Sequence, residues 1–261
     1  MKPRIYYVYK VDVDGITRYY GKGSGSRYLH ATSGNSTCEE LNSDIEKGLR
    51  KMKDKIVTFG EIMLRLSPEN NARFTQCNAF EAVYGGGEAN TAVSLANFDV
   101  DANYVTKLPK HIIGQAAINS LRQYGVGVDH IVRGGDQIGI YFLEKKTSQR
   151  PTNVIYNRAG SAFALATADD FDWDEIFDGA TWFHFSGITP AISDEMTNIC
   201  ITACQKAKEK GMTVSCDLNY RSKLWSSEKA CEAMSRICQY VDVCIANEDD
   251  AIGIFSMNPA D

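Results

Sequence analysis

Three polar residues at alternating positions have the chemistry to hold a phosphate or a carboxylate. They are Asp217, Asn219 and Arg221, in the run Ser215–Arg221 that continues an apolar stretch. Alternate residues of an extended segment point to the same side. The planar fork of an arginine pairs with two oxygens of a carboxylate or phosphate. We therefore expect a ligand site here, the alternative being a capped loop with a solvated arginine.

A second feature is the run Tyr84–Ala92, which reads Tyr-Gly-Gly-Gly-Glu-Ala-Asn-Thr-Ala. Glycines between a strand and a helix let the backbone approach a ligand, and the N-terminus of a helix favours an anion or a polar oxygen. A tight turn without any ligand would also explain these glycines. The spacing is not Gly-x-Gly-x-x-Gly, so it does not indicate a dinucleotide site.

A third feature consists of two alternating segments, residues 138–142 and 154–158. As neighbouring strands they would form a flap that presents Tyr141, Tyr156 and Arg158 on one face. Aromatic residues on strands are more often part of a core, so a structural role is the alternative.

The elements that position these features alternate regularly from Lys55 onward. The predicted strands are residues 55–66, 73–83, 102–108, 137–144, 153–158, 181–185, 212–217 and 241–246, and the predicted helices are residues 88–98, 113–124, 194–210, 227–240 and 248–255. This order predicts an α/β fold with a parallel sheet and helices on both faces. Ligands of such sheets bind beyond the carboxyl ends of the strands, where the polar features fall.

The first 51 residues have a different texture. Residues 4–10 and 16–20 are β-branched and aromatic, and Asp14-Gly15 between them is typical of a two-residue hairpin turn. Residues 38–51 are predicted to be helical. The sequence therefore predicts a short N-terminal segment of a β-hairpin followed by a helix.

Composition places the chain among ordinary globular proteins. It has 261 residues, 44% of them hydrophobic and 23% charged, with a net charge of −5 that argues against a protein dominated by nucleic-acid binding. Its eight cysteines form no Cys-x-x-Cys pair and are expected to be reduced thiols. We find no apolar run long enough to span a membrane and no signal-peptide core, and predict a cytoplasmic protein without a membrane partner.

The segment from Val57 to Ile254 resembles the ribokinase-like (PfkB) sugar kinases, and among them the 2-keto-3-deoxygluconate kinases. The matching blocks are Phe59–Met63, Gly85–Asn90, Trp182–Pro190, Asp217–Trp225 and Asn247–Ala251. The resemblance implies one ribokinase-like domain over residues 52–261, with a parallel sheet, helices on both faces and a small β lid from residues 62–83 and 137–158.

The resemblance also implies a reaction, transfer of the γ-phosphoryl group of ATP to the terminal hydroxyl of 2-keto-3-deoxygluconate with Mg²⁺ as cofactor. Arg221 would stabilise the substrate carboxylate or the transferred phosphoryl group, and Asn219 and Asn247 would lie on the nucleotide and Mg²⁺ side. The small sugar-acid substrate would be bound by Gly86, Asn90, Tyr141, Tyr156, Arg158 and Arg221. No metal ligand is assigned, and the family suggests a homodimer formed through the lid strands.

One departure from the family pattern concerns the catalytic base. In the family it belongs to a Gly-Ala-Gly-Asp turn that opens a helix, and these 261 residues contain no such segment. Gly134-Gly135-Asp136 is the nearest string, but it precedes a predicted strand. We therefore expect ATP-dependent turnover by this chain to be absent or weak, an apolar sheet edge to be exposed, and sugar-acid binding without phosphorylation to be an open alternative.

The first 51 residues resemble part of a GIY-YIG nuclease. The kinase-like sequence starts near the join Lys51/Met52. The resemblance matches Tyr6 and Tyr19 to the two motif tyrosines and Arg27 and His30 to the downstream arginine and histidine. The alternative function is thus a metal-dependent DNA endonuclease module fused to an inert sugar-binding fragment. DNA is a partner only in that case, and no residue stands out as the metal-binding carboxylate.

Overall fold

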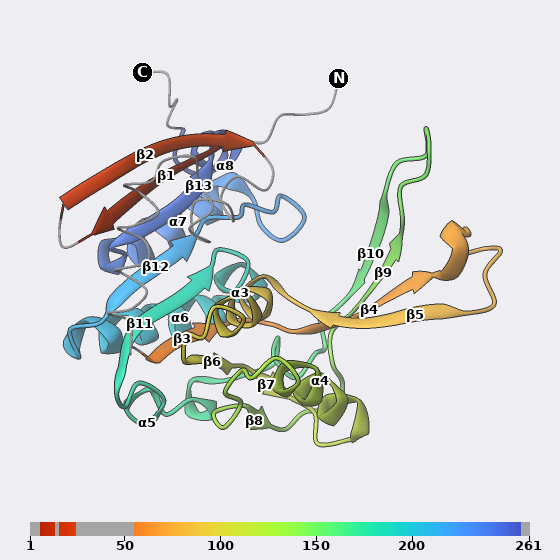
Figure 1. Cartoon of the computed structure of the whole chain (residues 1–261), viewed down its shortest axis with the longest axis horizontal. Helices are drawn as coiled ribbons and strands as arrows, with labels where there is room; N and C mark the ends of the chain where they lie inside the picture. Colours follow the sequence, from red (N-terminus) through yellow and green to blue (C-terminus); the bar gives the residue numbers. More distant parts are fainter. Residues whose placement is uncertain (1–5, 14–15, 25–54, 257–261) are drawn as a thin grey trace.

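The computed structural model describes residues 6–13, 16–24 and 55–256. Its main sheet has seven strands in the order β2-β1-β13-β12-β11-β3-β6 (Figure 1). The bounds are β1 Tyr6–Val13, β2 Ile16–Ser24, β3 Lys55–Phe59, β6 Ala102–Val105, β11 Ala180–Ser186, β12 Thr213–Asp217 and β13 Val243–Asn247. The five strands from β13 to β6 run parallel, while β1 and β2 are antiparallel additions.

Helices cover both faces of this sheet, which confirms the predicted α/β class. Strand residues that alternate in sequence join two separate cores, with Val105 in the first and Tyr104 in the second. Buried residues of α6 and α7 belong to the first core, and those of α3 and α4 belong to the second. The helices are α3 Gly87–Ala96, α4 Ile112–Arg122, α5 Trp173–Ile176, α6 Asp194–Glu209, α7 Ser227–Ile237 and α8 Glu248–Phe255.

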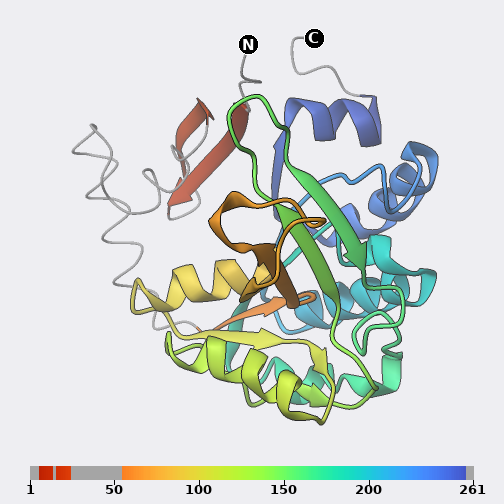
Figure 2. The ribbon, with the colours of Figure 1, turned by 90° about the vertical axis from the view of Figure 1, so that its right-hand side faces the viewer.

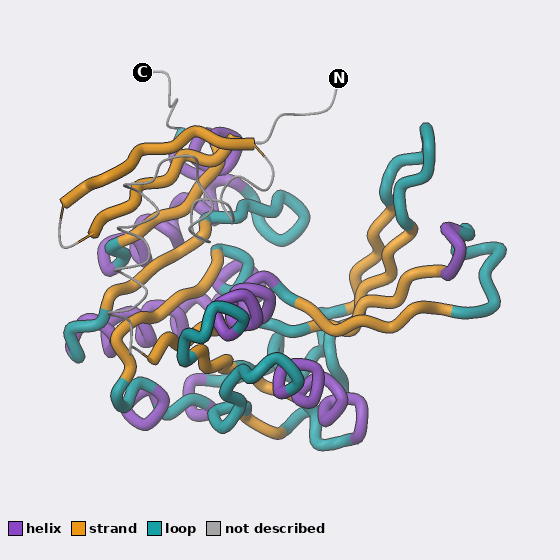
Figure 3. Tube along the Cα trace, in the orientation of Figure 1, coloured by secondary structure: helices purple, strands orange, loops and turns teal. Residues whose placement is uncertain are grey.

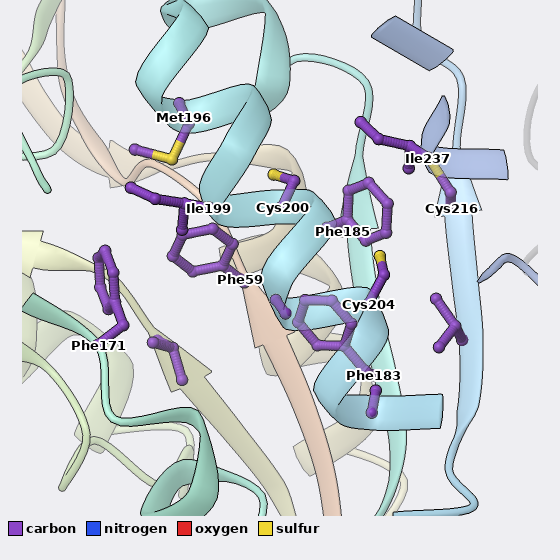
Figure 4. Close-up of a cluster of buried hydrophobic side chains, with 14 of the residues drawn as sticks. Phe59, Phe171, Phe183, Phe185, Met196, Ile199, Cys200, Cys204, Cys216 and Ile237 are labelled. Atoms are coloured by element: carbon purple, nitrogen blue, oxygen red, sulfur yellow. The ribbon is translucent and has the colours of Figure 1, made fainter. Parts of the chain in front are cut away.

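The first core is built around α6, which turns one apolar stripe toward β3 and β11. Met196, Ile199, Cys200 and Cys204 recur at helical spacing and belong to the same buried cluster as the phenylalanines of β3 and β11 (Figure 4). Cysteine and methionine fill the gaps between rigid rings without polar demands. The described cysteines are all free thiols, as predicted, and Cys38 lies outside the described residues.

A second sheet of four strands projects from the main one, in the order β10-β9-β4-β5 (Figures 1 and 2). Its strands are β4 Met63–Pro68, β5 Phe80–Gly85, β9 Ile140–Glu144 and β10 Asn153–Asn157. They are drawn apart from the seven-stranded sheet in the tube of Figure 3. A short parallel pair, β7 Lys107–Leu108 and β8 Val132–Arg133, completes the strands of the described part.

Three predicted strands differ clearly from the observed ones. The strand predicted over residues 102–108 is divided into β6 and β7, which belong to different sheets. Residues 55–66 form two strands rather than one, because the chain leaves the main sheet after Phe59 and enters the second sheet at Met63. The strand predicted over residues 73–83 begins only at Phe80. In these regions apolar or aromatic residues occur on both sides of the observed boundary, so the hydropathy pattern alone does not reveal it.

The N-terminal hairpin is an extension of the main sheet. β1 and β2 pair along their whole length, and β1 also pairs with β13 at Tyr7↔Asn247 and Val8↔Ala246. The hairpin strands are confirmed, while its turn residues and the helix predicted over 38–51 lie outside the described residues. An exposed apolar sheet edge was expected, and β1 covers the edge of the parallel strands at these two positions of β13.

Candidate functional site

The joint between the two sheets is the residue trio Gly60-Glu61-Ile62, between β3 and β4. Glu61 is buried there, with a side-chain exposure of only 3%. Its carboxylate forms an ion pair with the guanidinium of Arg158, which follows β10, and its Oε1 accepts a hydrogen bond of 2.5 Å from Ser161 Oγ. Burial raises the pKa of Glu61, and Arg158 and Ser161 oppose that rise. The joint is therefore held to the second sheet by a charged, hydrogen-bonded contact.

The glycine loop packs directly on this joint. A Cβ atom at Gly86 would overlap the carbonyl oxygen of Glu61, so the close approach requires glycine. Asn90 extends its side chain toward Gly85, whose Cβ would lie 3.4 Å from Asn90 Oδ1. Gly86 is the N-cap of α3, so the helix begins where the loop meets Glu61. Gly86 and Arg158, predicted separately, thus contact the same residue.

Glu88 fixes the start of α3 to the carboxyl end of β11. Its Oε1 accepts hydrogen bonds from the backbone N–H of Ser186 at 3.0 Å, from Ser186 Oγ at 2.6 Å and from Thr189 Oγ1 at 3.0 Å. Its other oxygen lies against Gly60, where a Cβ atom would overlap it. The carboxylate is buried and satisfied by three donors, which makes this contact rigid.

The two tyrosines of the second sheet lie side by side. Tyr141 and Tyr156 are ladder partners, and their ring centroids are 5.8 Å apart. The Tyr156 side chain is half exposed rather than part of a core. Arg158, two residues further on, has a side-chain exposure of 11%. Tyr156 therefore lies on β10, which Arg158 directly follows, and Tyr141 lies beside Tyr156 on the neighbouring strand β9.

The strand-end residues of β12 form an acidic and basic cluster. Burial, together with the nearby carboxylates of Asp250 and Glu88, raises the pKa of Asp217 to about 6, and Arg221 opposes the rise. Asp217 also accepts a hydrogen bond from the backbone of Asn219, whose φ of 40° is left-handed. Arg221 is exposed, and its NH1 donates to the carbonyl of Tyr220 at 3.1 Å. Its charge is available to an anionic ligand.

Asn247, assigned by resemblance to the nucleotide side, is the N-cap of α8. Its Oδ1 accepts a hydrogen bond of 2.7 Å from the backbone N–H of Asp250. Asp250 in turn accepts from the backbone N–H of Tyr220 at 2.9 Å. These two bonds join the end of β13 to the loop after β12, so Asn247 has a structural task that the motif did not reveal.

The described ranges contain no group of three histidine, cysteine, aspartate or glutamate residues that would cage a metal ion. Mg²⁺ commonly keeps several waters and binds through one or two carboxylates plus substrate phosphates. Asp217 and Asp250 are the carboxylates near the β12 end that fit such a role. The residues present are thus compatible with a Mg²⁺ ion delivered on a nucleotide.

The nuclease-like residues are placed only in part. Tyr6 pairs with Ser24 and Tyr19 pairs with Val11, so the two tyrosines are not ladder partners in the hairpin. Arg27 and His30 lie outside the described residues. The nuclease interpretation stays a prediction.

Sequence reasoning missed the residues that hold the site together, namely Glu61, Ser161, Glu88, Ser186 and Thr189. Each lies inside or beside a block that was noted for other residues. A charged residue between two glycine or apolar runs, as in Phe-Gly-Glu-Ile and Gly-Gly-Glu-Ala, was the available signal, since buried glutamates are rare without a partner. No helix in the described ranges is long and apolar enough to cross a membrane.

Comparison with known proteins covers most of the chain. A 2-dehydro-3-deoxygalactonokinase of Haloferax volcanii is 38% identical over 209 residues, which are 79% of this chain and 65% of that protein. The crystal structure of 2-dehydro-3-deoxygluconokinase from Thermotoga maritima is 53% identical with a TM-score of 0.77, covering 78% of this chain and 63% of that one.

A crystal structure of a PfkB family carbohydrate kinase from Listeria grayi matches at 34% identity and a TM-score of 0.77, covering 80% of this chain and 65% of that chain. The chain thus spans a little under two thirds of the length of each of these relatives. The model of the pfkB family of carbohydrate kinases matches residues 53–260. The match begins just after the predicted join and takes in both sheets apart from the N-terminal hairpin, and the chain belongs to the pfkB carbohydrate kinase family.

Proposed function

We propose that this chain supplies the sugar-acid site of a kinase that phosphorylates 2-keto-3-deoxygluconate (2-dehydro-3-deoxygluconate), or its galactonate epimer, with ATP. The observation that carries the proposal is the convergence of Gly86 and Arg158 on Glu61, beside the exposed Tyr156. Two relatives named for these sugar acids, at 38% and 53% identity, support the substrate class. The substrate is an anion, and a guanidinium is the side chain best suited to a carboxylate.

The proposed roles combine the family resemblance with the contacts described above. Arg158 would take the carboxylate, and the backbone at Gly86 with the amide of Asn90 would take hydroxyl groups. Tyr141 and Tyr156 would cover the sugar from the second sheet, which acts as the lid. Lid closure would exclude water, and exclusion of water strengthens every charged contact made to the substrate.

Arg221 would serve the phosphoryl group, with Asn219 and Asn247 on the nucleotide side. Bound ATP and Mg²⁺ supply the transferable phosphoryl group and neutralise its charge, so that the protein contributes position and positive charge rather than covalent chemistry. Asp217 and Asp250 would face the ion through water. Dimerisation through the lid strands belongs to the same proposal.

The test is thermal unfolding of the full chain with and without millimolar 2-keto-3-deoxygluconate, because a ligand of the native state raises the midpoint. We expect the ligand to raise the unfolding midpoint of the parent and of the control variant Lys145→Ala. That control removes only the exposed ion pair between Lys145 and Glu81 at the second sheet. The shift should be strongly reduced in Arg158→Ala. An unshifted parent would contradict the proposal.

Turnover is a separate question. Since the 261 residues contain no Gly-Ala-Gly-Asp segment, we expect binding of the sugar acid with weak or absent phosphorylation in the presence of ATP and Mg²⁺. Release of ADP at ordinary kinase rates would contradict the expected impairment while leaving the substrate assignment intact. The galactonate and gluconate acids should be compared in the same assay.

A further inference from the structure

Glu61 occupies a singular position, because four chain segments meet at its carboxylate and backbone. The segments are the joint itself, the glycine loop at Gly86, the approach to β9 at Gly139 and the exit of β10 at Arg158. A Cβ atom at Gly139 would lie 2.5 Å from Glu61 Oε1, so glycine there leaves room for the carboxylate. The residue thus links the main sheet, the loop and the second sheet in one place.

The two oxygens of Glu61 have different partners. Oε1 accepts from Ser161 Oγ at 2.5 Å, and Oε2 pairs with the NH2 nitrogen of Arg158. Ser161 is itself tied down, because its Oγ accepts from the backbone N–H of Ala164 at 3.0 Å. The carboxylate is therefore held in one orientation, and it holds one end of the guanidinium.

Arg158 retains unused hydrogen-bonding capacity. A guanidinium has five N–H donors in a rigid fork. Its Nε is buried and has no hydrogen-bond partner among the described residues. An unsatisfied buried donor is costly, so an acceptor that reaches this side chain gains the bond at little further desolvation.

We propose that Glu61 is a positioning residue, which orients Arg158 so that its remaining donors meet the carboxylate of the bound sugar acid. Glu61 itself does not touch the substrate. The proposal rests on the proposed function, since it concerns how the same site recognises an anion. Because a free arginine side chain would have to be ordered on binding, the fixed pair lowers the entropic cost of recognition.

The experiment is a double-mutant cycle on the full chain, with the dissociation constant of 2-keto-3-deoxygluconate measured by calorimetry. The variants are Glu61→Gln, Arg158→Ala and the double variant. We expect Glu61→Gln to weaken binding about tenfold in the parent and less than twofold in the Arg158→Ala background, because residues that act as one unit are not additive. A purely structural role of Glu61 would weaken binding equally in both backgrounds and would overturn the proposal.

Two further variants keep the test decisive if Glu61→Gln folds poorly. Ser161→Ala removes only the hydroxyl that fixes Glu61 and should weaken binding about threefold, again only while Arg158 is present. Glu81→Gln, which breaks the exposed pair with Lys145, is the matched control and should bind like the parent. Undiminished binding in both Glu61→Gln and Ser161→Ala would refute the positioning role, whereas a parent that does not bind would refute the proposed function itself.

Discussion

Glu88 and Ser186 are joined by two hydrogen bonds to one carboxylate oxygen, one from the serine backbone N–H at 3.0 Å and one from its hydroxyl at 2.6 Å. The contact connects the first turn of α3 with the last residue of β11. Thr189 adds a third donor to the same oxygen. The glycine loop directly precedes Glu88. The contact therefore fixes the position of this loop relative to the carboxyl end of β11.

Replacing Glu88 should therefore destabilise the fold strongly. Glu88→Ala leaves buried donors of Ser186 and Thr189 without an acceptor, and we expect a loss of about 3 kcal/mol in the free energy of unfolding. Urea denaturation measures it. Glu209→Ala, at an exposed site on α6 with a 3.6 Å pair to Lys206, should change stability by less than about 0.5 kcal/mol. Similar losses in the two variants would contradict the assigned contact.

Neighbouring glycines of the loop offer a matched pair. Gly86→Ala would push a methyl group into the carbonyl oxygen of Glu61, so we expect a loss of about 1–3 kcal/mol from the strain. Gly87→Ala meets nothing within 4 Å and lies in the first turn of α3, so it should be neutral or stabilise by about 0.5 kcal/mol. Thermal unfolding of both variants measures which of them is the less stable. A destabilised Gly87→Ala together with an unchanged Gly86→Ala would contradict the prediction.

The raised pKa of Asp217 predicts a pH-dependent loss of stability. Between pH 4 and pH 6 the folded state holds this proton, because its pKa is about 6, while the unfolded state has released it. Stability attributable to Asp217 therefore falls as the pH rises through this window. The free energy of unfolding of Asp217→Asn, relative to the parent, should increase by about 2 kcal/mol from pH 4 to pH 6.5. A difference that stays constant with pH would rule out the shift.

His184 predicts the opposite slope over almost the same window. The side chain is buried, its Nδ1 lies 2.9 Å from Ser215 Oγ, and burial lowers its pKa to about 4. Between pH 6.5 and pH 4 the unfolded chain gains a proton that the folded protein does not take up. The contribution of His184 to stability should therefore fall by about 2–3 kcal/mol on acidification through this range, so the free energy of unfolding of His184→Gln, relative to the parent, should rise by that amount. Denaturant titrations at several pH values measure both, and parallel curves would contradict the prediction.

The main sheet was predictable because its signals are local. Strand β13 begins with the apolar run Val243–Ala246, and the C-cap of α6 is followed by Gly211, whose φ of 73° favours glycine. The strand over residues 55–66 was predicted as one element because apolar residues continue through it. The bend at Gly60 follows from packing on Glu88, which lies far away in the sequence.

The residues of the candidate site could be proposed from sequence motifs, whereas the contacts that join them could not. Arg158 and Gly86 stand in recognisable motifs, whereas their common partner Glu61 looks like an ordinary charged residue after a strand. Contacts such as Glu61 with Ser161 and Glu88 with Ser186 depend on the tertiary fold. The antiparallel addition of β1 to β13 was equally inaccessible, since nothing in either strand specifies the other.

That addition has a consequence for the order in which the chain folds. On a ribosome β1 and β2 are made first, while β13, the strand that β1 pairs with at Tyr7↔Asn247, is the last of the described strands to be made. β1 therefore cannot pair with β13 until the intervening kinase-like region has been synthesised. Closing so long a loop is slow compared with local pairing. Docking of the hairpin is thus expected to come after the pairing of the other described strands of this sheet.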